Sequence, residues 1–444
     1  MRRLRRTARG RLGRFGPLAA LALLVALAPG AIAQTPPAGS DKTGEVTDLV
    51  NALLGSLMGG AEVTGASLQA EVAEAGGVPF KRDVPLAFIG RDELARYLKE
   101  LIDSEYPSGR ARSDERLLQA FDLLPPRTDL RALRGRLLEE NVAGFYDERP
   151  DRRRLYAVSE DRSFTPMNQI VLAHELRHAL QDQYRDLYAY LGDDVTDFDD
   201  RRIAWMSLLE GDATLVMERF VKQRLGLPGV EGAESAPGMD SAGFGAPGLF
   251  DLPDAPPVVR DHLIQPYLAG LALCRAVWAR GGAAALRDAW ASPPESTEQV
   301  LHPKHFFERE APRRVKPRLA PPAGAWQLSE GTLGELLLRS LLEPGAESAA
   351  EGWGGDGWRL YDVRSRTLLL WRSEWDTPAD AREFQTALRA RFDRHATREP
   401  AREGFDLFRN ASGFLFAVRT EGDSVELVSG DDPDAVVRVL TGRR

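Results

Sequence analysis

The spacing of hydrophobic and polar residues predicts a mainly helical first half of the chain. Apolar residues recur every three or four positions in several segments, which is typical of helices that bury one face. Three shorter segments favour strands, and the second and third of these are joined by a polar turn into a hairpin. The expected helices are 92–104, 113–124, 129–141, 166–187, 199–225 and 258–291, and the expected strands are 84–89, 142–147 and 155–158.

Two of these helices carry clear end signals. Thr165 and Pro166 supply an N-cap and a proline at the first helical position of the helix 166–187. Asp199 and Asp200 suit the positive end of the next helix, and Gly226 is expected to stop it. Residues 226–257 are rich in glycine, alanine and proline, so they predict a long surface loop, either a lid or a tolerated insertion.

A second region follows residues 312–322, where prolines and basic residues mark a boundary. Strands and helices alternate beyond it, which predicts a small α+β layer with its helices on one face of a sheet. The expected helices are 333–342, 378–392 and 432–441, and the expected strands are 361–363, 367–375, 405–409, 414–419 and 424–428. Four tryptophans are expected to pack into its core: Trp353, Trp358, Trp371 and Trp375.

The N-terminus has the pattern of a secretory signal peptide that ends at residue 33. Several arginines precede an apolar run and the small-residue sequence at residues 31–33. The apolar run, 18–28, is shorter than the roughly 20 residues that a membrane-spanning helix needs. We therefore expect an exported, periplasmic or extracellular protein with no membrane span after cleavage, and a loosely ordered lead-in at residues 34–80.

Composition narrows the functional classes. The net charge of −8 argues against a nucleic-acid partner. Cys274 is the only cysteine, so no disulfide can form within the chain, and its apolar surroundings predict a buried, inert thiol.

The chemistry is concentrated in one segment, His174-Glu175-Leu-Arg-His178, inside the expected helix 166–187. A separation of four residues places both imidazoles on one helical face, where they can share a zinc ion. Glu175 lies beside that face, so its carboxylate can reach a metal-bound water without binding the metal. We therefore expect zinc held by His174 and His178, with Glu175 as the general base.

Catalytic zinc takes three protein ligands and keeps one position open, so a third ligand is required. Glu210 is the best candidate because it lies in an otherwise apolar stretch, where an unpaired carboxylate is costly to bury. Glu218 is the alternative. Gly211 in the same helix suggests a close approach of the two ligand-bearing helices. Asp182 and Asp212 are either carboxylates that orient the imidazoles or solvated helix charges.

The order of His-Glu-x-x-His followed by a glutamate on the next long helix resembles the gluzincin, or thermolysin-like, class of zinc metallopeptidases. Residues 173–183, 209–213 and 293–303 also look like segments of a poorly characterised family of exported bacterial proteins, with similarity from about residue 82 to about residue 384. The resemblance implies a zincin-like catalytic domain at residues 81–315, followed by a smaller α+β domain at 316–444.

The resemblance also implies two further features. In such folds an edge strand above the metal pairs with the substrate backbone, and the strand containing residues 144–147, or its hairpin partner, is the candidate. Such enzymes use a downstream tyrosine or histidine to stabilise the oxyanion, for which Tyr146, His262, Tyr267 and His302 all stay open.

The sequence thus predicts an α+β protein, an exported zinc metallopeptidase that acts on a peptide or protein substrate. The alternative is a non-catalytic zinc protein of the cell envelope that keeps the metal for folding. A chance motif in a metal-free helical protein is the third interpretation. The substrate, the oligomeric state and the task of the C-terminal domain stay open.

Overall fold

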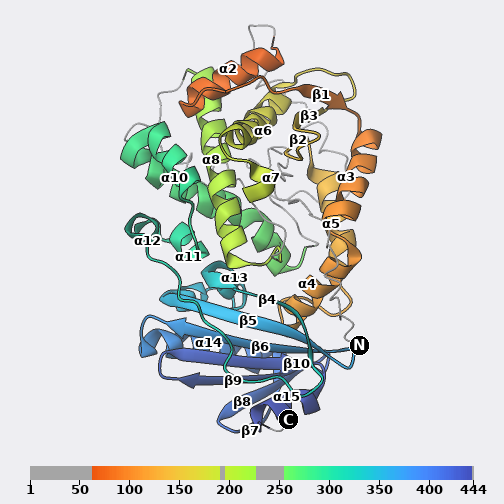
Figure 1. The fold of residues 1–444 in the computed structure, drawn as a ribbon, viewed down its shortest axis with the longest axis vertical. Coiled ribbons are helices and arrows are strands. Elements are labelled where there is room, and N and C mark those ends of the chain that lie inside the picture. Colours follow the sequence, from red (N-terminus) through yellow and green to blue (C-terminus); the bar gives the residue numbers. More distant parts are fainter. Residues whose placement is uncertain (1–62, 191–195, 227–254, 443–444) are drawn as a thin grey trace, which may run out of the picture.

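The computed structural model describes residues 63–190, 196–226 and 255–442. The predicted signal peptide, the first part of the predicted lead-in and most of the predicted loop 226–257 lie outside the described residues. Helices and a small sheet form the upper part of the molecule in Figure 1, and a large antiparallel sheet forms the lower part. The predicted α+β class is confirmed at this level.

The upper part contains most of the helices. Its helices are α2 (Gly65–Gly76), α3 (Arg91–Glu105), α4 (Ser108–Ala120), α5 (Leu130–Asn141), α6 (Pro166–Tyr184), α7 (Leu187–Tyr190), α8 (Asp200–Arg224), α10 (Pro257–Ala291), α11 (Thr297–Leu301) and α12 (Pro303–Glu308). Its strands are β1 (Leu86–Ile89), β2 (Gly144–Asp147) and β3 (Arg154–Val158). They form a sheet in the order β1-β3-β2, in which the predicted hairpin is antiparallel and β1 pairs in parallel with β3.

The helix ends follow local chemistry. Thr165 caps α6 by accepting a hydrogen bond from the Asn168 backbone, and Asp199 caps α8, as predicted. Helix α4 ends at Ala120, before the predicted end at residue 124, because Asp122 adopts a left-handed conformation (φ 59°) that closes the last turn. Helix α6 ends at Tyr184, three residues before the predicted end.

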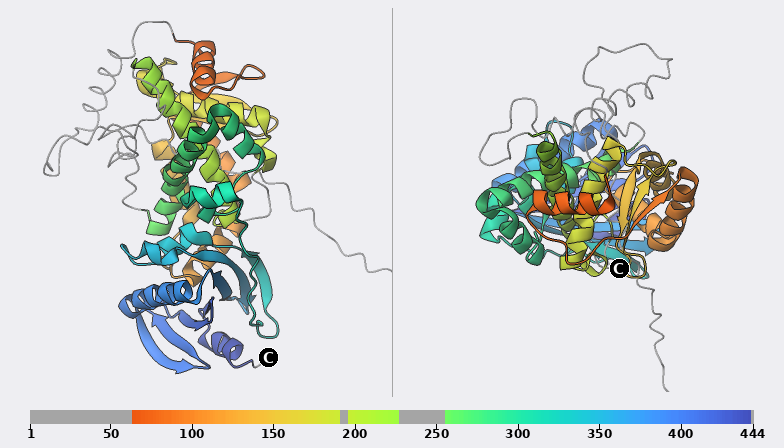
Figure 2. Two further views of the ribbon diagram at one scale, coloured as in Figure 1. Left: turned by 90° about the vertical axis from the view of Figure 1, so that its left-hand side faces the viewer. Right: turned by 90° about the horizontal axis from the view of Figure 1, so that it is seen from above.

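The expectation of a loosely ordered lead-in at residues 34–80 is wrong for its last part. Thr64 and Ser67 form a capping box that starts α2, and Gly77 ends the helix with φ 61°. Leu68 and Val72 are fully buried against α6 and α8. Figure 2 shows α2 lying across these two helices, so it covers the end of the helical region.

The lower part is one seven-stranded antiparallel sheet in the order β4-β5-β6-β10-β9-β8-β7. Its strands are β4 (Trp326–Gly331), β5 (Trp353–Val363), β6 (Arg366–Trp375), β7 (Ala396–Arg402), β8 (Phe405–Asn410), β9 (Leu415–Glu421) and β10 (Ser424–Gly430). Its helices are α13 (Gly334–Ser340), α14 (Pro378–His395) and α15 (Pro433–Leu440), with a 3₁₀ turn at Glu347–Ala350. The edge strands β4 and β7 were not predicted, because they contain few apolar residues and none of their residues is buried.

Both faces of this sheet are covered, so the expectation of helices on one face is wrong. Leu369 and Trp371 belong to an apolar cluster with residues of α13 and α14, whereas their neighbours Leu368 and Leu370 pack with α15. All four tryptophans predicted to form the core are buried, with at most 1% of each exposed. The indole N–H groups of two of them donate to the buried carboxylate of Asp356.

The two parts share a hydrophobic core. One apolar cluster runs from α3, α4 and α5 through α13 to β5, β6 and α14. Arg116 of α4 donates hydrogen bonds to Asp362 (2.9 Å) and Thr367 (2.9 Å) at the near end of the sheet. Within the described ranges, no helix is both long enough and apolar enough to cross a membrane.

Candidate metal centre

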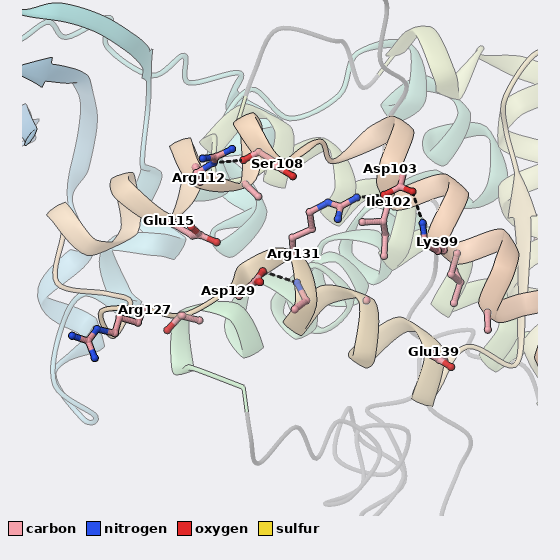
Figure 3. Close-up of a pocket in the computed structure, with 16 residues that line it drawn as sticks. Lys99, Ile102, Asp103, Ser108, Arg112, Glu115, Arg127, Asp129, Arg131 and Glu139 are labelled. Atoms are coloured by element: carbon pink, nitrogen blue, oxygen red, sulfur yellow. Dashed lines mark hydrogen bonds and ion pairs between the residues drawn. The ribbon is translucent and has the colours of Figure 1, made fainter. Parts of the chain in front are cut away.

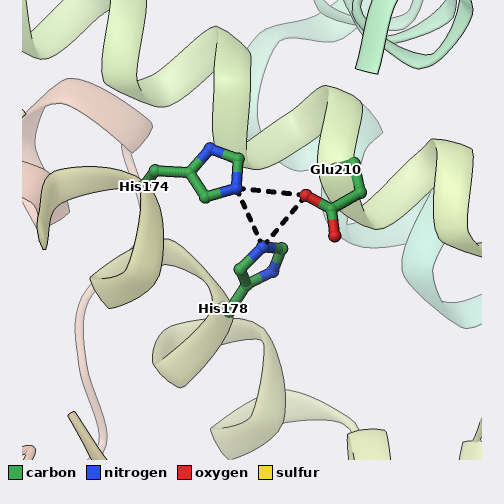
Figure 4. Close-up of side chains that lie close together, drawn as sticks. All are labelled: His174, His178 and Glu210. Atoms are coloured by element: carbon green, nitrogen blue, oxygen red, sulfur yellow. Dashed lines mark hydrogen bonds and ion pairs between the residues drawn. The ribbon is translucent and has the colours of Figure 1, made fainter. Parts of the chain in front are cut away.

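Two adjacent helices bring three predicted ligands together. Helix α6 carries His174 and His178 one turn apart, and α8 packs against it with Glu210 facing the two rings. In Figure 4 the two imidazoles and the carboxylate point toward one another. The side chains of all three are buried, with 0%, 1% and 3% of each residue exposed.

The three ligand atoms form a nearly equilateral triangle. Glu210 Oε2 lies 3.1 Å from His174 Nε2 and 3.3 Å from His178 Nε2, and the two Nε2 atoms are 3.0 Å apart. A tetrahedral zinc ion with bonds of about 2.0–2.1 Å separates its ligand atoms by about 3.3 Å. The donor set and its spacing therefore fit one zinc-sized ion with a fourth position left over. Among the described residues, this is the one group of its kind.

The electrostatics of the cluster suit a cation. Burial alone would raise the pKa of Glu210, but the two imidazoles outweigh it and lower the pKa to about 2. Burial opposes the charge on His178, yet Glu210 raises the pKa of that ring to about 9. A buried carboxylate that holds a proton on its neighbour is the protonated counterpart of a metal complex, because a metal ion takes the place of the proton.

Glu175 lies next to this cluster with one oxygen held and one free. Its Oε2 accepts a hydrogen bond from the backbone N–H of Tyr146 at 2.9 Å, which fixes the carboxyl group against β2. Its Oε1 is buried and has no hydrogen-bond partner. Burial raises the pKa of Glu175 to about 8. A carboxyl group that is held through one oxygen and has its other oxygen free is the arrangement that a proton acceptor requires.

A chain of hydrogen bonds orients His178. Its Nδ1 lies 2.9 Å from the amide oxygen Oε1 of Gln181 and donates to it, so Nε2 is the ring nitrogen that faces Glu210 and His174. The Gln181 amide donates to Asp212 Oδ2 at 2.7 Å, and Asp212 is paired at 2.9 Å with the fully buried Arg177. Trp290 Nε1 also donates to Asp212. Asp212 thus acts on the imidazole through Gln181, a residue that the sequence reasoning missed.

The structure places the other two candidate carboxylates elsewhere. Asp182 contacts neither imidazole and is not a solvated helix charge, because it is buried and accepts hydrogen bonds from the Tyr146 hydroxyl and the Leu187 backbone, both at 2.9 Å. Glu218, the alternative third ligand, is buried and paired with Arg275 at 2.7 Å. Glu210 is therefore the glutamate of α8 that faces the two histidines.

The expected close approach at Gly211 occurs, but with a different helix. A Cβ atom at Gly211 would lie 2.0 Å from the backbone carbon of Gly270 in α10, and one at Gly270 would lie 1.9 Å from the Ser207 carbonyl oxygen. Helices α8 and α10 therefore cross backbone to backbone directly beside Glu210. The prediction that α6 makes this contact is wrong, because α6 presents larger side chains to α8.

Four residues were open as oxyanion stabilisers, and the structure separates them. The hydroxyl of Tyr146 donates to Asp182, and His302 pairs with Glu335 at 3.0 Å. His262 and Tyr267 of α10 line a cavity together with Glu210. The ring of Tyr267 stacks on the His174 ring with their centroids 5.9 Å apart. Of these four residues, His262 and Tyr267 therefore line a cavity with a metal-ligand candidate.

A wide groove lies away from this cluster. It has a volume of about 800 Å³ between α3, α4 and α5, and none of the three ligand candidates lines it. Two ion pairs lie along it, and Figure 3 shows them: Lys99 with Asp103 and Arg131 with Asp103. This groove offers no grouping of residues that suggests chemistry.

The comparisons with known proteins concern the lower part of the molecule. Residues 323–440 match a family model described as Domain of unknown function (DUF8575). No curated protein and no solved structure matches the chain. The matched segment starts just after the proline-rich stretch 312–322, and it contains the seven-stranded sheet but none of the metal-ligand candidates.

Proposed function

We propose that this chain is an exported zinc metallopeptidase of the gluzincin type, with a zincin-like arrangement in its helical part. The observation that carries the proposal is the buried triangle of His174, His178 and Glu210 beside a free oxygen of Glu175. Zinc bound there would lower the pKa of a water molecule to about 7 and polarise a carbonyl group. Two imidazoles and one carboxylate are a common ligand set for catalytic zinc.

The chain's own residues then have defined tasks. Glu175 Oε1 takes the proton of the attacking water, while the Tyr146 N–H keeps the carboxyl group in place through Oε2. The same oxygen delivers that proton to the leaving amine. Gln181 holds His178 in the tautomer that binds a metal through Nε2. Strand β2 is an edge of its sheet, so we propose that the backbone groups on its outer side, apart from the Tyr146 N–H that Glu175 already occupies, pair with the substrate backbone.

A second function is favoured by one observation. The three ligand candidates and Glu175 expose at most 3% of their surface, which suits a metal kept for folding. In that case the chain is a zinc-stabilised protein of the cell envelope without catalysis. The two functions predict the same zinc content and differ in peptide cleavage.

The experiment that tests the proposal compares Glu175→Gln with Glu218→Gln in the zinc-loaded protein. A glutamine at 175 can still accept the Tyr146 hydrogen bond but cannot take a proton, so zinc content should stay and cleavage of a peptide library should disappear. Glu218 is equally buried on the neighbouring helix and outside the cluster, so its variant controls for the loss of a buried charge. Persistent cleavage by Glu175→Gln would overturn the assignment, and a wild type that binds zinc but cleaves no library would favour the scaffold.

A further inference from the structure

A small cavity adjoins the metal centre. Its volume is about 70 Å³, and Glu210 forms part of its wall. Tyr267, which stacks on His174, forms another part. A group in this cavity therefore lies beside Glu210 and is separated from His174 by the ring of Tyr267. The remaining wall residues come from α5, α8 and α10 and from the segments that follow α3 and precede α8, and they include Leu137, Leu138, Phe198, Met206, Val259 and Leu263.

The chemistry of the wall selects against charged groups. Most of the lining side chains are aliphatic or aromatic. Arg134 is the cationic residue in the lining, and its guanidinium is paired with the buried Asp197. A charged side chain that entered would exchange water for an apolar wall without gaining a free partner, which is costly.

One polar atom in the lining is uncommitted. His262 is buried and stacks on Phe198, with ring centroids 4.6 Å apart, and its Nδ1 has no hydrogen-bond partner. Burial lowers the pKa of His262 to about 4, so the ring is neutral at pH 7. A neutral imidazole can exchange one hydrogen bond with an uncharged hydroxyl or amide.

The size of the cavity limits its occupant. An apolar cavity of about 150 Å³ in another protein binds a benzene ring, and one water molecule needs about 10–15 Å³. The value of about 70 Å³ lies between these limits. The space admits a few carbon atoms but not an aromatic ring.

We propose that this cavity receives the side chain of a substrate residue next to the scissile bond and selects short, uncharged side chains such as those of alanine, valine and threonine. The proposal rests on the proposed peptidase function, because it assigns the substrate class to the same site. Leu137, Met206 and His262 are then specificity-determining residues. Glu210 places the pocket at the reacting bond.

The test uses the full chain and two matched leucine variants of α5. Leu137 lines the cavity, whereas Leu133 is buried on the same helix without lining it. The zinc-loaded wild type should cleave library peptides with valine or threonine at one flanking position at least about 10-fold faster than peptides with phenylalanine there. Leu137→Ala should reduce that ratio at least about tenfold, and Leu133→Ala should leave it unchanged. If Leu137→Ala does not fold, Met206→Ala serves the same purpose.

A second readout needs neither zinc nor turnover. Ligand-observed NMR on the metal-free protein should detect N-acetylvalinamide but not N-acetylphenylalaninamide, and Leu137→Ala should gain binding of the second probe. A wild type that cleaves but prefers aromatic or charged residues, or is indifferent to size, overturns the pocket and leaves the peptidase standing. A wild type without cleavage overturns the peptidase, and the NMR preference then decides the pocket by itself.

Discussion

Replacing Gln181 by leucine tests whether the hydrogen-bond chain behind His178 serves metal binding. The change keeps the approximate size of the side chain and removes three hydrogen bonds. Their partners are His178 Nδ1 at 2.9 Å, the Leu209 carbonyl at 3.1 Å and Asp212 Oδ2 at 2.7 Å. The imidazole is then free to hold its proton on either nitrogen. Arg177 and Trp290 still satisfy Asp212, so no buried charge is left alone.

The expected magnitude follows from these contacts. Loss of the outer partner of a metal-bound histidine typically lowers metal affinity 10–100-fold, or about 1.4–2.7 kcal/mol. The unpaired Leu209 carbonyl and the lost bond to Asp212 add a folding cost of roughly 1–3 kcal/mol that has nothing to do with the metal. Metal affinity and folding stability therefore have to be measured separately.

Gln183 provides the matched control. It lies two residues further along α6 and also makes three hydrogen bonds, accepting from the backbones of Lys81 and Arg82 and donating to the Arg82 carbonyl. Gln183→Leu should lower the free energy of unfolding in urea by a similar amount. Zinc affinity, measured by competition with a chelator of known strength, should fall only in Gln181→Leu. Equal zinc affinities for Gln181→Leu and the wild type, or an equal loss in both variants, would refute the reasoning.

Three further predictions concern the metal, the packing beside Glu210 and a buried carboxyl group at the start of α8. Zinc at 100 times its Kd should stabilise chelator-treated protein by about 2.7 kcal/mol, and no such shift should occur in Glu210→Ala. Gly211→Ala should destabilise the fold by roughly 1–3 kcal/mol or more in urea titrations, because its Cβ meets the α10 backbone, whereas Gly135→Ala, with its nearest neighbour at 3.5 Å, should be neutral or stabilising. Burial raises the pKa of Asp200 to about 8, so the folded chain keeps a proton that the unfolded chain releases above about pH 4. The free energy of unfolding should therefore fall by at most about 1.4 kcal/mol per pH unit between pH 4 and 8, and this contribution to the pH dependence should be absent in Asp200→Asn. Equal slopes of unfolding free energy against pH in the variant and the wild type would contradict this prediction.

The part of the site that could be predicted from sequence is the part set by local geometry. The positions of His174 and His178 follow from the pitch of one helix, and Glu175 follows from being next to them. Glu210 was found because a carboxylate among apolar residues needs a partner, and burial with two imidazoles satisfies that need. The thiol of Cys274 is buried as expected, and burial raises its pKa well above the ordinary value. Each of these inferences required only the geometry of a single helix or the sequence neighbours of a single residue.

The rest depends on contacts between distant segments. Gln181 gave no signal because its role comes from Leu209 and Asp212, 28 and 31 positions further along the chain. The contact between Gly211 and Gly270 was assigned to the wrong helix because a glycine marks a close approach without naming its partner. Helix α2 was missed because its alanine and glycine content hides a short apolar stripe. The early start of β5 was missed because Gly354 and Gly355 weaken the strand pattern, although a side chain at Gly355 would meet the Arg313 backbone.

Helix α8 connects the two parts of the molecule mechanically. At its first turn the Asp200 backbone N–H donates to the Thr332 carbonyl at 3.0 Å, and the Asp200 carboxyl accepts from the Thr297 backbone N–H at 2.8 Å. Gly334 packs so closely on Asp200 that a Cβ atom would lie 1.9 Å from its Oδ1. Glu210 follows ten residues, or about 15 Å, along the same helix. The region that matches the family model therefore holds one end of the helix that carries Glu210. Because a helix is stiff along its axis, this contact gives the large sheet a structural reason to be attached to the candidate metal centre.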